Sequence, residues 1–178
     1  MFYSWRRFVP LALFPVLLLV VGGCQQPPKP MQFNNMIAKT NQKLSEASKK
    51  FYKALEPLKS GAPADASAAQ NAYTEITTAL RDARTTYDSL SAPFGSTTGP
   101  ELLANYRSFL TVQQTILDSC ISPMNKILQD NANYPDAGAK WVAIAPLIAK
   151  ASEEESSVMA TLRETQKKYC KEHVLDPK

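Results

Sequence analysis

Histidine is almost absent from this chain of 178 residues, and its scarcity excludes several classes of metal protein. His173 is the only histidine, so no set of histidines can bind zinc and no Glu-x-x-His pairs can build a di-iron centre. There are three cysteines, and none lies in the C-x-x-C-H pattern that attaches haem covalently. The sequence therefore offers no ligand set for zinc, di-iron or covalently bound haem.

Catalytic motifs are also missing. The chain contains no G-x-S-x-G nucleophile elbow, no P-loop and no glycine-rich dinucleotide turn. Groups that only folding brings together leave no such motif, so a small hydrolase stays as an alternative. We expect a protein that is not an enzyme and that carries no cofactor.

A strong charge of either sign is lacking as well. Of 20 basic residues, Arg6 and Arg7 belong to the N-terminal segment, which leaves 18 basic against 16 acidic side chains in the rest of the chain. This near balance gives no nucleic-acid signature. The content of 44% hydrophobic and 20% charged residues is typical of a folded domain rather than of disorder.

Only the N-terminus carries a long apolar run. Arg6 and Arg7 precede an apolar stretch from Phe8 to Val21, which is too short to span a bilayer comfortably and ends in small residues at Val21-Gly22-Gly23-Cys24. This quartet resembles the lipobox of bacterial lipoproteins, with Val21 where leucine is more usual. The resemblance covers the first 24–30 residues and implies cleavage before Cys24 and acylation of that cysteine.

The resemblance divides the chain into three parts: a signal peptide at residues 1–23, the lipidated Cys24 with a proline-rich tether at residues 24–30, and a domain at residues 31–178. Three prolines between positions 27 and 30 keep the tether extended. Gln25 stands where an aspartate would retain a lipoprotein on the inner membrane of enteric bacteria. We therefore expect a lipid-anchored, periplasm-facing protein, on the outer membrane where the source has one.

Beyond the tether, apolar residues recur at helical spacing in four segments, at about residues 33–55, 67–90, 100–127 and 141–169. Such segments joined by short polar loops predict an all-α fold, an antiparallel up-down four-helix bundle with proline-kinked helices. The boundaries rest on a few residues: Pro57 and Gly61 ending the first helix, Ser67 and Gln70 as a capping box, Pro100 opening the third helix, and kinks at Pro123 and Pro146.

Cys120 and Cys170 form a possible disulfide, as two cysteines in an exported protein suggest. In a simple hairpin of the third and fourth helices, however, Cys120 lies opposite about Lys150. Cys170 is then about twenty residues, or roughly 30 Å, further along the helix. A disulfide needs Cα atoms within about 7 Å. Either the hairpin differs from this picture or both thiols stay reduced.

Three polar features have both a structural and a functional interpretation. His173 is either a solvent-exposed side chain or, with Met31 or Met36, a ligand of non-covalent haem. Glu155 and Gln113 lie near the apolar stripes of their helices and could form a partly buried polar layer, while Glu153 and Glu154 continue a solvated face. The first helix carries an excess of lysine, which is either a solvated face or a surface for anionic lipid or acidic polymer: Lys39, Lys43, Lys49, Lys50, Lys53 and Lys59.

Together these features predict a non-enzymatic, lipid-anchored envelope protein whose bundle binds or scaffolds another envelope component, a protein or a polymer, and no nucleic acid. Two alternatives stay open. A haem-type electron-transfer bundle would use His173, and an envelope chaperone or stress sensor would display an exposed apolar groove.

Overall fold

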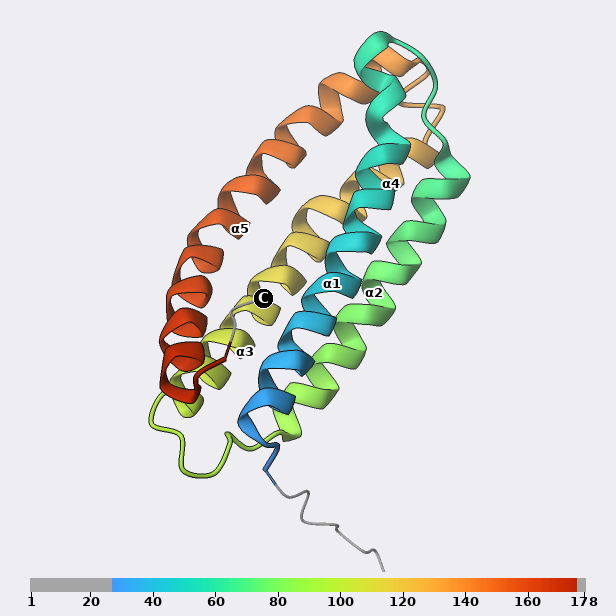
Figure 1. Cartoon of the computed structure of the whole chain (residues 1–178). Helices are drawn as coiled ribbons and strands as arrows, with labels where there is room; N and C mark the ends of the chain where they lie inside the picture. The colour runs from blue at the N-terminus through green and yellow to red at the C-terminus, as the bar shows by residue number, and fades with distance from the viewer. Residues whose placement is uncertain (1–26, 176–178) are drawn as a thin grey trace, which may run out of the picture.

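The computed structural model describes residues 27–175, and all regular secondary structure in this range is helical, as predicted. The predicted lipidation site, Cys24, lies outside the described residues. The elements follow in the order α1 (Pro30–Leu55), the 3₁₀ turn η1 (Glu56–Ser60), α2 (Ala66–Ser89), α3 (Gly99–Ile116), the π-helical turn η2 (Leu117–Ile121), α4 (Ser122–Gln129) and α5 (Ala137–His173). Figure 1 shows them side by side as an elongated helical bundle.

The boundaries of the first two helices follow from local chemistry. Pro57 turns the end of α1 into the tighter η1, and Gly61 then adopts a left-handed conformation with φ of 76°, which glycine accepts without strain. The capping box predicted at Ser67 is wrong. Asp65 is the N-cap of α2, because its carboxylate accepts a hydrogen bond from the backbone N–H of Ala68 at 2.8 Å.

The two internal prolines behave differently. Pro123 has no N–H to donate, and the preceding turn widens into η2, where the N–H of Ser122 bonds to the carbonyl of Leu117 five residues back. The irregularity expected at Pro123 is therefore a π-helical turn that joins α3 to α4. Pro146 lies inside α5, which continues past it to His173.

The apolar stripes form one core. The apolar residues that repeat at helical spacing along α1 and η1 are all buried: Ile37, Leu44, Ala47, Phe51, Leu55 and Leu58. In α2, Leu80 is only 1% exposed. The largest fully buried side chains come from all four helical segments: Phe33, Ile37, Phe51, Leu80, Tyr87, Leu102, Tyr106, Leu110, Met124 and Tyr169. In α5 the stripe is less complete, since Trp141, Ile148 and Val158 are half-buried.

The helices do not pack evenly. The most extensive contacts join α1 to α2 and α3 to α5, whereas α1 and α5 touch little. In Figure 1 the orange-red α5 runs apart from α1 over the middle of its length. Among the described helices, none combines the length and the apolarity needed to cross a membrane.

Candidate functional site

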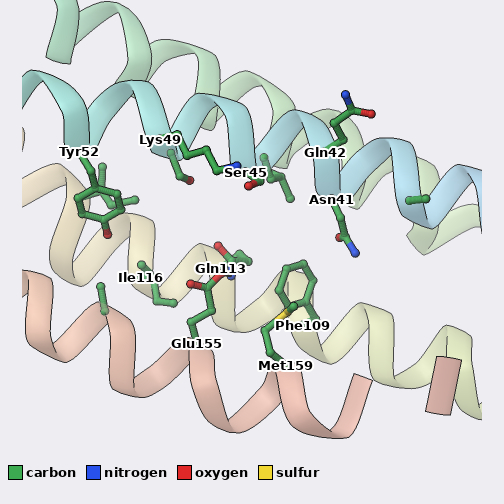
Figure 2. Close-up of a pocket in the computed structure, with 15 residues that line it drawn as sticks. Asn41, Gln42, Ser45, Lys49, Tyr52, Phe109, Gln113, Ile116, Glu155 and Met159 are labelled. Carbon is green, nitrogen blue, oxygen red and sulfur yellow. Dashed lines mark hydrogen bonds between the residues drawn. The ribbon is translucent and has the colours of Figure 1, made fainter. Parts of the chain in front are cut away.

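A groove of about 650 Å³ opens between α1, α3 and α5. Its walls come from three parts of the chain that are far apart in the sequence (Figure 2). The lining residues are Ala38, Asn41, Gln42, Leu44, Ser45, Ser48, Lys49 and Tyr52 of α1, Phe109, Gln113 and Ile116 of α3, Ile121 of η2, and Ala151, Glu155 and Met159 of α5.

The groove stays open where small side chains of α1 face a charged side chain of α5. The α1 wall presents small residues, Ala38, Ser45 and Ser48, at helical spacing. The facing part of α5 carries Glu155, an exposed carboxylate that would lose hydration if the helices closed. Small side chains on one helix and a charged one on the other therefore leave an open space.

The floor of the groove is apolar. Phe109 and Ile116 of α3 are buried beneath it, and Met159 of α5 is half-buried beside them. Figure 2 shows Phe109 and Met159 directed toward each other in the space between the helices. An apolar group entering here would exchange water for aromatic and thioether surface.

A polar layer crosses the middle of the groove. The amide of Gln113 donates a hydrogen bond to Oε1 of Glu155 at 2.9 Å (Figure 2). The two residues singled out in the sequence are thus brought together, with Gln113 half-buried and Glu155 exposed. Burial, followed by the negative charge of Glu155, raises the pKa of Tyr52 to about 12, so its phenol is protonated and can donate.

At one end of the groove, a hydrogen bond fixes the orientation of the Asn41 amide. The hydroxyl of Tyr106 donates to Oδ1 of Asn41 at 2.9 Å. The ring of Tyr106 stacks on Phe109 and meets Tyr87 edge to face, with centroids 5.7 and 4.5 Å away. Burial raises the pKa of Tyr106 well above its usual range, which keeps this donor protonated. The amide nitrogen of Asn41 can therefore point to a ligand while its oxygen is held.

Cys120 and Cys170 are both buried, and the structure shows no disulfide between them. Cys120 belongs to η2, between α3 and α4. Cys170 lies at the end of α5, where its thiol donates to Oδ1 of Asn34 at 3.8 Å. The two cysteines lie in different elements, η2 and the end of α5, and no disulfide joins them.

His173 is half-buried, which corrects the expectation of a solvent-exposed side chain. Its Nε2 lies 2.9 Å from Oγ of Ser96, and its ring packs against Tyr169 with centroids 4.6 Å apart. The predicted partner Met31 is exposed and Met36 half-buried. The imidazole thus helps to hold a loop, and this arrangement gives the haem hypothesis no support.

The same loop is held by Glu172, a contact that sequence reasoning missed. Its carboxylate accepts from the backbone N–H groups of Thr97 and Thr98 at 2.7 and 2.9 Å and from the hydroxyl of Thr98. These hydrogen bonds lower the pKa of Glu172 to about 2. We call Glu172 and His173, with Ser96, Thr97 and Thr98, the clasp. It joins the end of α5 to the start of α3.

The five lysines of α1 and Lys59 of η1 form a solvated face, since all six are exposed. Lys50 pairs with Glu75 of α2 at 2.7 Å, and Lys49 lies at the rim of the groove. An exposed pair of this kind contributes little to stability. Glu153 is exposed as expected, whereas Glu154 is half-buried and faces Lys150 at 3.8 Å.

In chemical terms, the groove can contact apolar groups and exchange hydrogen bonds. Residues 27–175 contain no cluster of three or more histidine, cysteine or acidic side chains that could hold a metal ion.

The sequence pointed to Gln113 and Glu155 but not to Asn41, Ser45 or Ser48. A run of small residues beside the apolar stripe of α1 was the available signal for the two serines. Comparison of the chain with protein-family models, curated proteins and solved structures found no match.

Proposed function

We propose that this protein is a lipid-anchored envelope protein, acylated at Cys24, whose antiparallel up-down bundle binds another envelope component without catalysing a reaction. The groove between α1, α3 and α5 supports the binding role. It combines an apolar floor with hydrogen-bonding groups along both walls. The pairing of α1 with α2 and of α3 with α5 supports the up-down order of the helices.

The shape of the groove suggests the kind of component that fits. Its α1 wall extends from Ala38 to Tyr52, a rise of fourteen residues or about 21 Å along the helix. An extended segment of a protein or polymer matches this length better than a compact metabolite does. Apolar groups would contact Phe109 and Met159, and polar groups would meet Asn41, Gln113 and Glu155. The groove offers binding on a large scaffold rather than a concentrated reactive centre.

The anchor is tested by Cys24→Ala in cells that process lipoproteins. The helices of the described domain are amphipathic, and none could span a bilayer, so we expect the exported variant to lose membrane association. Fractionation measures this directly. A Cys24→Ala protein that still sediments with membranes would contradict the assignment.

The groove is tested by photo-crosslinking in the native envelope. A photoreactive phenylalanine analogue at Ser45, which is exposed and lines the groove, is compared with the same analogue at Thr85, which is exposed on α2 away from it. We expect a discrete adduct from position 45 that disappears when Ser48→Phe fills the groove. Equal adducts at positions 45 and 85, or an adduct that survives Ser48→Phe, would contradict binding in the groove.

The apolar floor also favours a second candidate, an envelope chaperone. Phe109, Ile116 and Met159 could contact unfolded segments of many sequences. A chaperone would suppress aggregation of a reduced, unfolded client, and Ser48→Phe would reduce that effect. A single adduct in the crosslinking experiment favours a specific partner, whereas a broad distribution of adducts favours the chaperone.

A further inference from the structure

Three large apolar side chains are exposed at one end of the bundle. Phe94 and Val174 are each 94% exposed and Met31 is 61% exposed. They come from the loop before α3, the residue after α5 and the first turn of α1. The other large hydrophobic residue exposed to this degree in the described chain, Val142 at 75%, lies near the start of α5, at the opposite end.

Specific contacts bring these three segments together. The hydroxyl of Tyr169 donates to the carbonyl of Pro30 at 3.1 Å, which ties the end of α5 to the start of α1. The clasp ties that same end of α5 to residues 96–98 of the loop. Figure 1 shows the blue start of α1, the yellow-green loop and the red end of α5 at the same end of the bundle.

Phe94 is held at the tip of a tight turn. The N–H of Ser96 bonds to the carbonyl of Pro93 at 3.4 Å, and Gly95 takes a left-handed φ of 75°. The clasp fixes the residues that follow. The aromatic ring therefore projects outward from an anchored loop. Its insertion into a binding partner or a membrane would cost little conformational entropy of the loop.

The covalent path of the chain indicates what faces this end. Cys24 precedes Pro30 by six residues, which span at most about 21 Å when extended. Helix α1 alone is about 39 Å long at 26 residues. A lipid on Cys24 therefore keeps the start of α1 close to the bilayer, while the opposite end can stand well away from it.

We propose that the end formed by Met31, Phe94 and Val174 is a membrane seat, in which these side chains insert into the interfacial region of the bilayer that holds the acylated Cys24. This inference rests on the proposed lipidation. Charge at this end is mixed, with Lys29 and Lys171 beside Asp88 and Glu101, all exposed. Apolar insertion, rather than attraction to anionic headgroups, is therefore the interaction that we propose to hold this end at the membrane.

The test uses the full lipoprotein, purified from membranes and reconstituted into phosphatidylcholine vesicles with brominated acyl chains. Phe94→Trp is introduced together with Trp141→Phe, because Trp5 belongs to the cleaved signal peptide and the new tryptophan is then the only one. Mass spectrometry confirms cleavage and acylation. We expect the emission of Phe94→Trp to shift to the blue and to lose most of its intensity to bromine quenching.

The matched control is Val142→Trp in the same background, since Val142 is an exposed apolar residue at the other end. We expect its emission to be unaffected by brominated lipid. If the lipoprotein floats with the vesicles and Phe94→Trp is quenched no more than Val142→Trp, the membrane seat is wrong and the anchor stands. If the protein with Cys24 intact does not float, both the anchor and the seat fail. Quenching that requires anionic lipid and disappears in high salt would overturn apolar insertion in favour of electrostatic attachment.

Discussion

Helix α1 has two packing interfaces, which we call seams: a closed seam with α2 and an open seam with α5. Beside α2 it buries Ala47 and Ala54, and the buried residues of α2 include alanines around Ile76 and Leu80. Against α5 its small and polar residues face a helix whose middle carries glutamates, and the groove remains. Small side chains thus permit close approach only where the facing helix offers apolar groups to fill the space. The same residue size gives a core in one seam and a binding surface in the other.

The closed seam is most sharply tested by Leu80→Ala. Leu80 is 1% exposed, so its truncation removes burial and leaves a cavity. We expect a loss of about 2–5 kcal/mol in the free energy of unfolding. Arg81→Ala, on the exposed side of the same helix, should cost no more than about 0.5 kcal/mol. Chemical denaturation measures both variants, and equal midpoints would mean that this stripe is not the core.

The open seam closes at its tether end, where α1 and α5 make several contacts that include a buried hydrogen-bonded pair. The amide of Gln166 donates to Oδ1 of Asn34 at 2.9 Å, and both side chains are buried. Asn34→Ala leaves that amide without its acceptor, so we expect a loss of about 1–3 kcal/mol. Gln42→Ala, whose partner Glu46 is exposed on the same helix, is the control and should change little. A loss from Asn34→Ala no larger than this control would show that α1 and α5 are not joined there.

The middle of the open seam should tolerate truncation. Met159 is half-buried beside the groove, so Met159→Ala enlarges a space that water already reaches. We expect a loss of about 1 kcal/mol or less, well below that of Leu80→Ala. Chemical denaturation of the two variants in one buffer compares their losses in the free energy of unfolding. A cost for Met159→Ala that matches Leu80→Ala would mean that the groove is packed shut.

The clasp should stabilise α5 in a pH-dependent manner. The pKa of Glu172 is lowered to about 2 in the folded chain from an ordinary value of 4.5, so its contribution is present above pH 4.5 and is lost as the pH falls toward 2. We expect Glu172→Gln to lower the Tm at pH 7, and the difference from the wild type to vanish near pH 2. Glu164→Gln, an exposed neighbour paired with Lys167, is the control. A Tm difference that persists unchanged at pH 2 would contradict the role of the carboxylate.

The smallest expected effect lies in the groove itself. Burial and then Glu155 raise the pKa of Tyr52 to about 12. Glu155→Gln removes the negative charge and should lower this pKa, which stays above 10 because burial is the larger cause. Absorbance of the phenolate reports the titration, and Tyr52→Phe assigns the signal, since the pKa of Tyr87 is also raised to about 12. An unchanged titration in Glu155→Gln would show that the carboxylate does not face Tyr52.

Much of the fold could be predicted because periodicity is local. The stripes through Ile76 and Leu80, and the breaks at Pro57 and Pro123, follow from neighbours in the sequence. The start of α2 was misplaced because Ser67 and Asp65 both have capping side chains, and only the backbone path decides between them. Bends and caps depend on backbone conformation, which the periodicity of apolar residues does not determine.

The candidate site was harder to predict because it depends on which helices meet. Gln113 and Glu155 stood out by their position near the stripes, and their hydrogen bond agrees with that. The serines of α1 look like any solvated face until the position of α5 is known. The clasp joins residues 74–77 positions apart, and no local pattern marks such a contact.

The contrast between the two seams is tested most directly by neighbouring residues of α1. Ala47 is 3% exposed and lies in the closed seam, whereas Ser48, the next residue, lines the groove. Thiol labelling compares the access of reagent to Ala47→Cys and Ser48→Cys in the acylated protein. The wild type gives the baseline from the buried Cys120 and Cys170. We expect Ser48→Cys to react at least about tenfold faster, because Ala47→Cys becomes accessible only when the helices separate. Equal rates at the two positions would contradict the contrast between the two seams.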